Sequence, residues 1–274
     1  MATLKKPRYW HELTTRDFDA LDKDKVVAVL PVSATEQHGP HLPVLVDAGL
    51  NKGIVDKAIS LLPQELDVLV LPAQTIGKSD EHAAFPGTLT LSTETLIRVW
   101  TEIGECVARA GIRRLLIFNS HGGQPQVVDI VARDLRIRLG MFVVTTAWWQ
   151  LDHQPGLFSD AEMKHGIHGG AVETSMMLHL HPGLVRMDKA QNFVSLSALM
   201  ENEYRLLTPE GGVGFGWQAQ DLNEQGACGD ATLADAEKGK LLVDGAAAGL
   251  VELLGEIARY PLENIRLREV LPKA

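Results

Sequence analysis

The chain has 274 residues, of which 45% are hydrophobic and 22% are charged, and its formal net charge is −9. This composition is typical of a soluble globular protein, and the length suits one large α/β domain over residues 1–274. The negative charge argues against nucleic acid or an anionic membrane surface as the main partner.

The two cysteines, Cys106 and Cys228, form no C-x-x-C pair. This argues against a disulfide framework and against a zinc site built from thiolates. No apolar signal core follows the lysines near the N-terminus, and no apolar run approaches the ~18 residues of a membrane span. We therefore expect a cytoplasmic protein.

Segments typical of strands and helices alternate along the chain. In chain order, the patterns predict a strand at Val26–Val32, a helix at Asp47–Leu62, a strand at Leu66–Leu71, a helix at Ser92–Ala110, a strand at Arg114–Phe118, a helix at Gln126–Leu139, a strand at Met141–Thr146 and helices at Ala171–Leu180 and Ala234–Arg259. Such alternation indicates βαβ units, which form a largely parallel sheet with helices on both faces.

The segment 208–230 has a different texture, since it is rich in glycine and has no long apolar run. One interpretation is a long surface loop. Long loops are uncommon in compact domains and often serve as lids or binding loops, so a functional or interface role is the alternative.

Carboxylates and imidazoles follow two of the predicted strands. Glu36 and His38 come after the first strand and, one residue apart, point to the same side of an extended chain. Asp47 begins the next helix, and His121 follows the third strand. In open α/β sheets the carboxyl ends of the strands meet at the ligand-binding edge, so these side chains should converge. Imidazole and carboxylate without thiolate suit catalytic zinc, manganese or iron.

Glu173 is a further acidic candidate, at the start of an otherwise apolar helix. A buried carboxylate there needs a cation or hydrogen-bond donors, although the helix dipole alone could stabilise it. Together with Glu36 and Asp47 it would bring three negative charges. Two divalent ions and one hydroxide would neutralise them, which favours a binuclear centre with Asp47 as the bridge.

The chain resembles the creatininase (creatinine amidohydrolase) family at these residues and beyond. The resemblance is carried by the segments Leu30–His41, Phe85–Leu91, Asn119–Gly123, His168–Ser175 and 229–239. It implies a three-layer α/β/α fold, a binuclear metal centre, hydrolysis of amide-type C–N bonds and assembly into a homohexamer.

The resemblance also implies roles for individual residues. Glu36 and His121 would hold one metal, His38 the other, and Asp47 would bridge them. His168 matches the histidine that handles protons in the family. Glu173 matches the acid of the E-T-S motif at the metal centre.

Two departures from creatininase bear on the substrate. Creatininase has a glutamate ligand two residues after its H-G-type histidine, where this chain has Gly123. Either Glu173 supplies the missing carboxylate, or the second metal is bound weakly. Of the two tryptophans that close the creatininase pocket, Trp149 matches one and Lys164 stands at the other position. A lysine there suggests a larger or anionic substrate. His82, before Phe85–Leu91, is a third candidate for substrate contact, with a surface-loop histidine as the alternative.

These residues predict a metal-dependent amidohydrolase that attacks a small cyclic or linear amide through a metal-bridging hydroxide, with His168 passing a proton to the leaving nitrogen. A formamide deformylase or peptidase of the same family, and a metal-binding relative without catalysis, are the alternatives. A phosphoryl-transfer protein is disfavoured because the chain has no phosphate-binding G-x-x-x-x-G-K-[ST] loop. Ser120 cannot form a triad with adjacent His121 alone. The remaining site-region histidine, His41, and the more distant His153, His165, His179 and His181 are expected to be structural or exposed.

Overall fold

The computed structural model describes residues 8–151 and 154–266. Its main sheet has four strands in the order β2-β1-β3-β4, and each neighbouring pair is parallel. The strands are β1 (Val27–Val32), β2 (Val68–Val70), β3 (Arg114–Asn119) and β4 (Phe142–Ala147). The predicted parallel sheet is therefore confirmed.

Helices connect consecutive strands, as the alternating sequence pattern predicted. They are α2 (Val46–Leu61), α3 (Thr93–Arg109) and α4 (Pro125–Leu139). Ser92 caps α3 because its hydroxyl accepts from the Thr95 amide. Gly140 ends α4 at a φ of 66°, a left-handed conformation that glycine adopts without strain.

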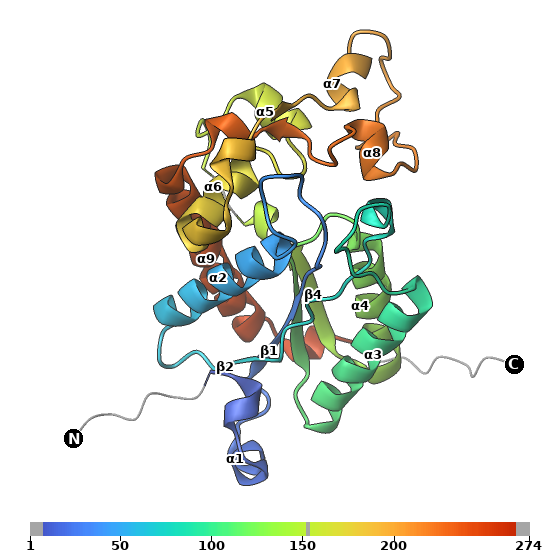
Figure 1. Cartoon of the computed structure of the whole chain (residues 1–274). Helices are drawn as coiled ribbons and strands as arrows, with labels where there is room; N and C mark the ends of the chain where they lie inside the picture. The colour runs from blue at the N-terminus through green and yellow to red at the C-terminus, as the bar shows by residue number, and fades with distance from the viewer. Residues whose placement is uncertain (1–7, 152–153, 267–274) are drawn as a thin grey trace, which may run out of the picture.

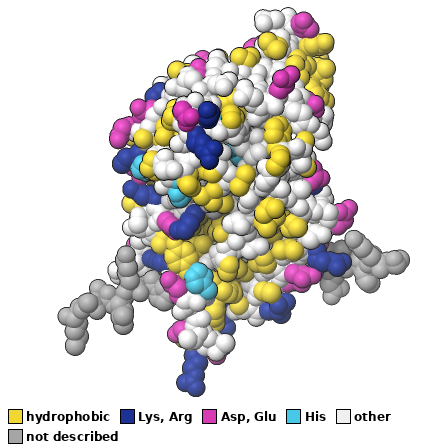
Figure 2. Space-filling view, in the orientation of Figure 1, with side chains coloured by type: hydrophobic (Ala, Val, Ile, Leu, Met, Phe, Trp, Pro, Cys, Tyr) yellow, Lys and Arg dark blue, Asp and Glu magenta, His cyan; other side chains and the backbone are white. Residues whose placement is uncertain are grey.

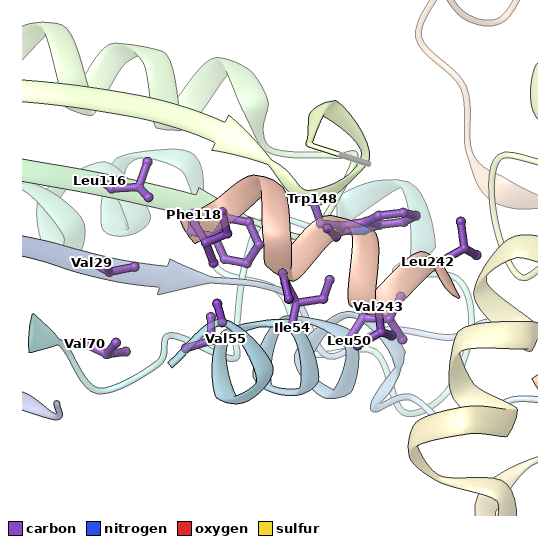
Figure 3. Close-up of a cluster of buried hydrophobic side chains, with 14 of the residues drawn as sticks. Val29, Leu50, Ile54, Val55, Val70, Leu116, Phe118, Trp148, Leu242 and Val243 are labelled. Carbon is purple, nitrogen blue, oxygen red and sulfur yellow. The ribbon is translucent and has the colours of Figure 1, made fainter. Parts of the chain in front are cut away.

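One face of the sheet is covered by α2 together with α6 (Ala171–Leu180) and α9 (Ala236–Arg259) (Figure 1). Figure 3 shows side chains from the sheet, such as Val29 and Phe118, facing Ile54 of α2 and Val243 of α9. These side chains are buried, and removing apolar area from water is the main force that holds the layers together.

The opposite face is covered by α3 and α4 (Figure 1). Leu30 of β1 belongs to a second buried cluster with Trp100 of α3 and Leu135 of α4. Gly104 allows α3 to approach α4 closely, since a Cβ at this position would lie 2.3 Å from Leu135 Cδ1. With helices on both faces, the molecule has the predicted three-layer α/β/α architecture.

The remainder of the chain forms short elements around the carboxyl edge of the sheet and at the periphery. The short α-helices and strands are α1 (Thr15–Ala20), α5 (Asp160–His165), α7 (Leu196–Met200), α8 (Ala219–Leu222), β5 (Asn192–Phe193) and β6 (Gly229–Asp230). The 3-10 helices are Trp10–Glu12, Asp80–His82, Trp148–Gln150, Pro182–Leu184, Met187–Lys189, Ala231–Leu233 and Leu262–Asn264. Strands β5 and β6 pair in antiparallel fashion.

The glycine-rich segment 208–230 is more than a surface loop. It contains α8 and most of its end is buried, with Ala227 and Cys228 nearly inaccessible to solvent. Cys228 pairs through its backbone with His168, so this part of the segment lies against the candidate site.

The surface shows no single-sign charge field in the view of Figure 2, where acidic, basic and hydrophobic side chains are interspersed. Over the part of the chain that the structure describes, no helix is both long enough and apolar enough to cross a membrane.

Candidate metal centre

The sheet topology brings the two predicted half-sites together. Val32 at the end of β1 lies beside Asn119 at the end of β3, so the segments with Glu36, His38 and His121 leave the same edge as neighbours. Asn51 of α2 fixes this junction, because its amide donates to the carbonyls of Val32 and Phe118, each at 3.2 Å.

Asp47 lies between two imidazoles in the first turn of α2. Its Oδ1 is 3.4 Å from His38 Nε2 and its Oδ2 is 3.2 Å from His121 Nδ1. The same His121 nitrogen is 3.2 Å from Glu36 Oε1. All four side chains are buried, and the helix N-terminus favours the negative charge of Asp47.

Backbone acceptors fix how the two imidazoles face the carboxylates. His38 Nδ1 lies 3.1 Å from the Glu36 carbonyl, and His121 Nε2 lies 2.7 Å from the Lys78 carbonyl. When each of these nitrogens donates its N–H to the carbonyl, the other nitrogen is directed at the carboxylates. Histidine ligands in metalloproteins are oriented in this manner.

The other side of the site comes from α6 and the segment before it. Glu173 Oε2 is 3.7 Å from His38 Nε2 and accepts from the Gly169 amide at 2.6 Å. The His168 ring packs against His38 and His82, with centroid distances of 4.0 and 4.2 Å. His168 Nε2 lies 2.7 Å from the Gln37 carbonyl, which leaves Nδ1 directed toward Glu36 Oε1 at 3.8 Å.

The donor set fits divalent metal ions. Among the described residues, Glu36 Oε2, His38 Nε2 and Asp47 Oδ2 are buried atoms without a hydrogen-bond partner. Buried polar atoms are ordinarily hydrogen-bonded, and the usual alternative is a cation. Three groups of side chains have ligand atoms within 4.8 Å of one another: Glu36, His38 and His168; Glu36, Glu81 and His121; and His38, Asp47 and Glu173.

The pKa values of the site show how strongly these groups interact. Burial lowers the pKa of His38, but the neighbouring carboxylates of Asp47, Glu173 and Glu36 outweigh this effect and raise the pKa to about 9. His121 is likewise held well above its usual pKa by Glu36 and Asp47, despite the opposing effect of burial. In the absence of metal, protons on these imidazoles thus balance the carboxylates.

Burial shifts the pKa values of His168 and Glu173 in the direction that favours the uncharged form of each side chain. Burial lowers the pKa of His168 well below its usual value, and the neighbouring His38 and His82 lower it further. Burial raises the pKa of Glu173 to about 7. Shifted pKa values of this kind are typical of functional sites, and the pKa of Glu173 lies near neutral pH.

Two residues of the site were missed by sequence reasoning. The Glu81 carboxylate lies 3.4 Å from His121 Nε2, and Gln37 Nε2 donates to the Gly226 carbonyl at 2.8 Å while lying 2.7 Å from His82 Nδ1. Glu81 lies in the 3-10 helix Asp80–His82, after the loop that follows β2, so the rule applied to β1 and β3 points to this edge of the sheet but not to this residue. Gln37 carried no signal beyond its place between Glu36 and His38.

The candidates for substrate contact lie in different surroundings. His82 is buried inside the site, with Nε2 3.4 Å from Glu36 Oε1, so it is not a surface-loop residue. Trp149 is 40% exposed and packs edge-on against buried Trp148. Lys164 pairs with Glu201 and lines a cavity of about 670 Å³ with His165, Ser197, Tyr204, Arg205 and Glu210.

The other histidines have structural surroundings, as expected. Buried His41 lies 2.9 Å from the Gly169 carbonyl through Nε2. His165 lies 2.9 Å from the Ser197 hydroxyl and 3.0 Å from Glu201. His179 and His181 are partly exposed at the end of α6, whereas His153 lies outside the described residues.

Comparison with known proteins agrees with this geometry. The creatininase family model, described as creatinine amidohydrolase, matches residues 11–254. A mycofactocin precursor peptide peptidase of Mycobacterium tuberculosis is 31% identical over 240 residues, covering 85% of this chain and 84% of that protein. A creatinine amidohydrolase of Pseudomonas putida is 32% identical over 195 residues, covering 65% and 74%. The solved structure of creatininase Mn has a TM-score of 0.71 at 27% identity, covering 92% of this chain and 98% of that chain. By sequence and by fold, this chain belongs to the creatininase family.

Proposed function

We propose that this protein is a metal-dependent hydrolase that cleaves the C–N bond of an amide at the edge of its parallel sheet. The observation that carries the proposal is the convergence of buried ligand atoms without partners on Glu36, His38 and Asp47. Glu36 and His121 would hold one divalent ion, His38 the other, and Asp47 would contact both. Glu173 lies beside His38 as a further ligand.

Bound divalent ions of this kind lower the pKa of water and polarise a carbonyl oxygen. The protein residues supply the rest of the chemistry. The carboxylates and imidazoles of the site are buried away from water, where charges interact more strongly than in bulk solvent. The hydrogen bonds from His38 and His121 to backbone carbonyls keep both rings in place during the reaction.

His168 is the residue we propose for proton transfer. One ring nitrogen is bound to the Gln37 carbonyl, so the other is available on the side of Glu36. Burial keeps the imidazole in its neutral form, so it would hold a proton only transiently before giving it to the leaving nitrogen. Glu173 accepts a hydrogen bond from the amide of Gly169, the residue that follows His168, and this contact helps to fix the position of His168.

The substrate class has two forms that the relatives make concrete. One is a small cyclic or linear amide, and a creatinine amidohydrolase is among the relatives. The other is a peptide, since a relative that matches more of the chain is a precursor peptide peptidase. The cavity at Lys164 has room for an extended substrate, but its basic side chains Lys164 and Arg205 are matched by the acidic Glu201 and Glu210, so its size rather than its charge favours a substrate larger than creatinine.

The experiment is metal removal and reconstitution followed by a substrate panel. The chelator-treated protein would be loaded with Zn²⁺, Mn²⁺ or Fe²⁺, and the metal content would be determined by elemental analysis. Creatinine, formamides and short peptides would then be assayed, with Glu36→Gln as the inactive control. About two ions per chain and turnover of one substrate class are expected. Metal without any turnover would favour a non-catalytic relative, and absence of metal binding would reject the proposal.

The homohexamer and the cytoplasmic location remain predictions. An assembly would cover part of the apolar surface near α7, where Leu199, Leu206 and Val213 are more than half exposed. Sedimentation velocity of the purified protein would determine the oligomeric state.

A further inference from the structure

The side chain of Glu81 occupies the space next to Gly123. A Cβ atom on Gly123 would lie 1.8 Å from Glu81 Oε1 and 2.6 Å from His121 Nε2. No side chain can therefore stand at position 123 while Glu81 keeps this conformation. The carboxylate reaches the histidine from a different segment, the 3-10 helix Asp80–His82.

Glu81 belongs to a group of potential ligands with Glu36 and His121. Their ligand atoms lie within 4.8 Å of one another, and the Glu81 side chain is only 17% exposed. Glu36 Oε2 in this group is buried and has no hydrogen-bond partner in the described structure. Carboxylates placed this closely together repel each other unless a cation lies between them.

A purely structural role explains the position of Glu81 poorly. His121 Nε2 already lies 2.7 Å from the Lys78 carbonyl, a shorter contact than the 3.4 Å to Glu81 Oε1. The orientation of His121 thus does not require a carboxylate at this position. The ion pair with His121 lasts only while that ring carries a proton, so once His121 is a neutral metal ligand the mostly buried carboxylate needs a different cation.

The loop that carries Glu81 is anchored at several points. The Lys78 amide donates to Gln124 Oε1 at 3.1 Å, and the Ser79 amide donates to Thr90 Oγ1 at 2.9 Å. His82, the next residue, lies 2.7 Å from Gln37 Nε2 through its Nδ1. These bonds hold Glu81 on rigid surroundings, which is what a metal ligand needs.

We propose that Glu81 is a ligand of the metal ion held by Glu36 and His121. Its carboxylate, which comes from the segment Asp80–His82, takes the place of the one that a glutamate at position 123 would provide. This inference rests on the metal centre of the proposed function. With Glu81 the site has four carboxylates, Glu36, Asp47, Glu81 and Glu173, one more than the three that two divalent ions and a hydroxide would neutralise. Gly123 is then the residue that makes room for the exchange.

The test compares metal binding by wild type, Glu81→Gln, Asp80→Asn and the double variant Glu81→Ala/Gly123→Glu. Asp80 is the matched control, because it precedes Glu81 in the same loop but is exposed and pairs with Lys78. Metal content is measured by elemental analysis after dialysis, and affinity by competition with a chromogenic chelator. Thermal unfolding of each metal-free variant verifies that it folds.

Wild type and Asp80→Asn are expected to retain about two ions per chain and Glu81→Gln about one, with affinity for the lost ion reduced at least 100-fold. The double variant should recover the second ion in part, since its carboxylate comes from position 123 but its Cβ forces the His121 ring to shift. Retention of both ions by Glu81→Gln, with dissociation constants within threefold of wild type, would overturn the assignment but leave the proposed function intact. Equal loss in Asp80→Asn would also overturn it. Absence of metal from wild type would reject the proposed function itself.

Discussion

Asp47 Oδ2 lies 3.2 Å from His121 Nδ1, and this contact joins the first turn of α2 to the segment that follows β3. The second oxygen of Asp47 faces His38. One buried carboxylate thus contacts the imidazoles of both predicted metal positions, which is the geometry of a bridging ligand.

Asp47→Asn is expected to remove both metal ions, because the amide keeps the shape of the side chain but loses the negative charge shared by the two positions. The ions stabilise the transition state, and losing about 4 kcal/mol of this stabilisation corresponds to a roughly thousandfold lower kcat. Elemental analysis and steady-state kinetics would measure both effects. Asp129→Asn on the exposed face of α4 serves as the control, and wild-type metal content in Asp47→Asn would contradict the bridging role.

His168→Gln is expected to keep its metal and lose turnover. The glutamine amide can still donate to the Gln37 carbonyl, but it cannot accept and release a proton in the reaction. We expect kcat to fall by about 10²–10⁴-fold, with the remaining activity lacking the pH dependence of wild type. The pH profile of kcat and the metal content would be measured together. If kcat stayed within about threefold of wild type with metal bound, the proton-transfer role would be wrong, since general acid–base catalysis contributes far more than this.

Much of the fold and half of the site could be predicted from the sequence. Strand and helix periods located the four strands and their helices, and the rule for parallel sheets brought Glu36, His38, Asp47 and His121 to one edge. Glu173 was identified as an acidic residue at the start of an otherwise apolar helix, whereas the proton-transfer role of His168 came from family resemblance. The contacts of both residues depend on the packing of α6, which no local pattern encodes.

Glu81 shows why the remainder of the site was not predicted. Only three residues of β2, Val68–Val70, are paired as a strand, and the loop after it has no periodicity. The neighbourhood of Glu81 and Gly123 is set by packing between sequence-distant loops. The expectation that Glu173 replaces the missing ligand overlooked this contact, although Glu173 does lie beside His38. That residues 1–274 form one domain stays a prediction.

The metal-free protein is expected to lose stability as the pH rises from about 4.5 to about 9. Glu173, whose pKa is raised from 4.5 to about 7 by burial, and His38, whose pKa rises from 6.5 to about 9 as its carboxylate neighbours outweigh burial, bind protons more tightly when folded. Their contribution is fully present below the unfolded values and is lost as the pH passes through about 7 and about 9. Each of the two shifts corresponds to at most about 3 kcal/mol of stability.

Urea unfolding of chelator-treated protein between pH 4 and pH 9.5 would measure this profile. Burial lowers the pKa of His41 to about 4, and its contribution is lost as the pH falls from about 6.5 through 4. This opposes the effect of Glu173 in the same interval, so the net slope should be smaller on the acid side than on the alkaline side. Metal loading should abolish the alkaline decline, because metal ions replace the protons. If the stability of the metal-free protein did not change with alkaline pH, the carboxylates and imidazoles of the site would not interact as described.

Two glycines of α9 provide a matched pair for testing helix packing. A Cβ on Gly239 would lie 1.9 Å from the Ser175 carbonyl oxygen of α6, whereas on Gly255 the nearest atom would be Arg259 Nη1 at 3.7 Å. Gly239→Ala should destabilise the protein by about 1–3 kcal/mol through overpacking. Gly255→Ala should stabilise it by about 0.5–1 kcal/mol, because alanine favours helices. Urea unfolding of both variants is the measurement, and equal effects would contradict the close α6–α9 contact.

The bond from Gln37 Nε2 to the Gly226 carbonyl spans 189 positions of the chain. During synthesis the N-terminal residues emerge first, so this bond can form only when most of the protein has been made. The residues Glu36 to Asp47 therefore leave the ribosome long before His168, Glu173 and the segment around Gly226 can enclose them. Closure of the site is a late event in biogenesis, and a metal ion that meets the growing chain early finds only part of its ligands.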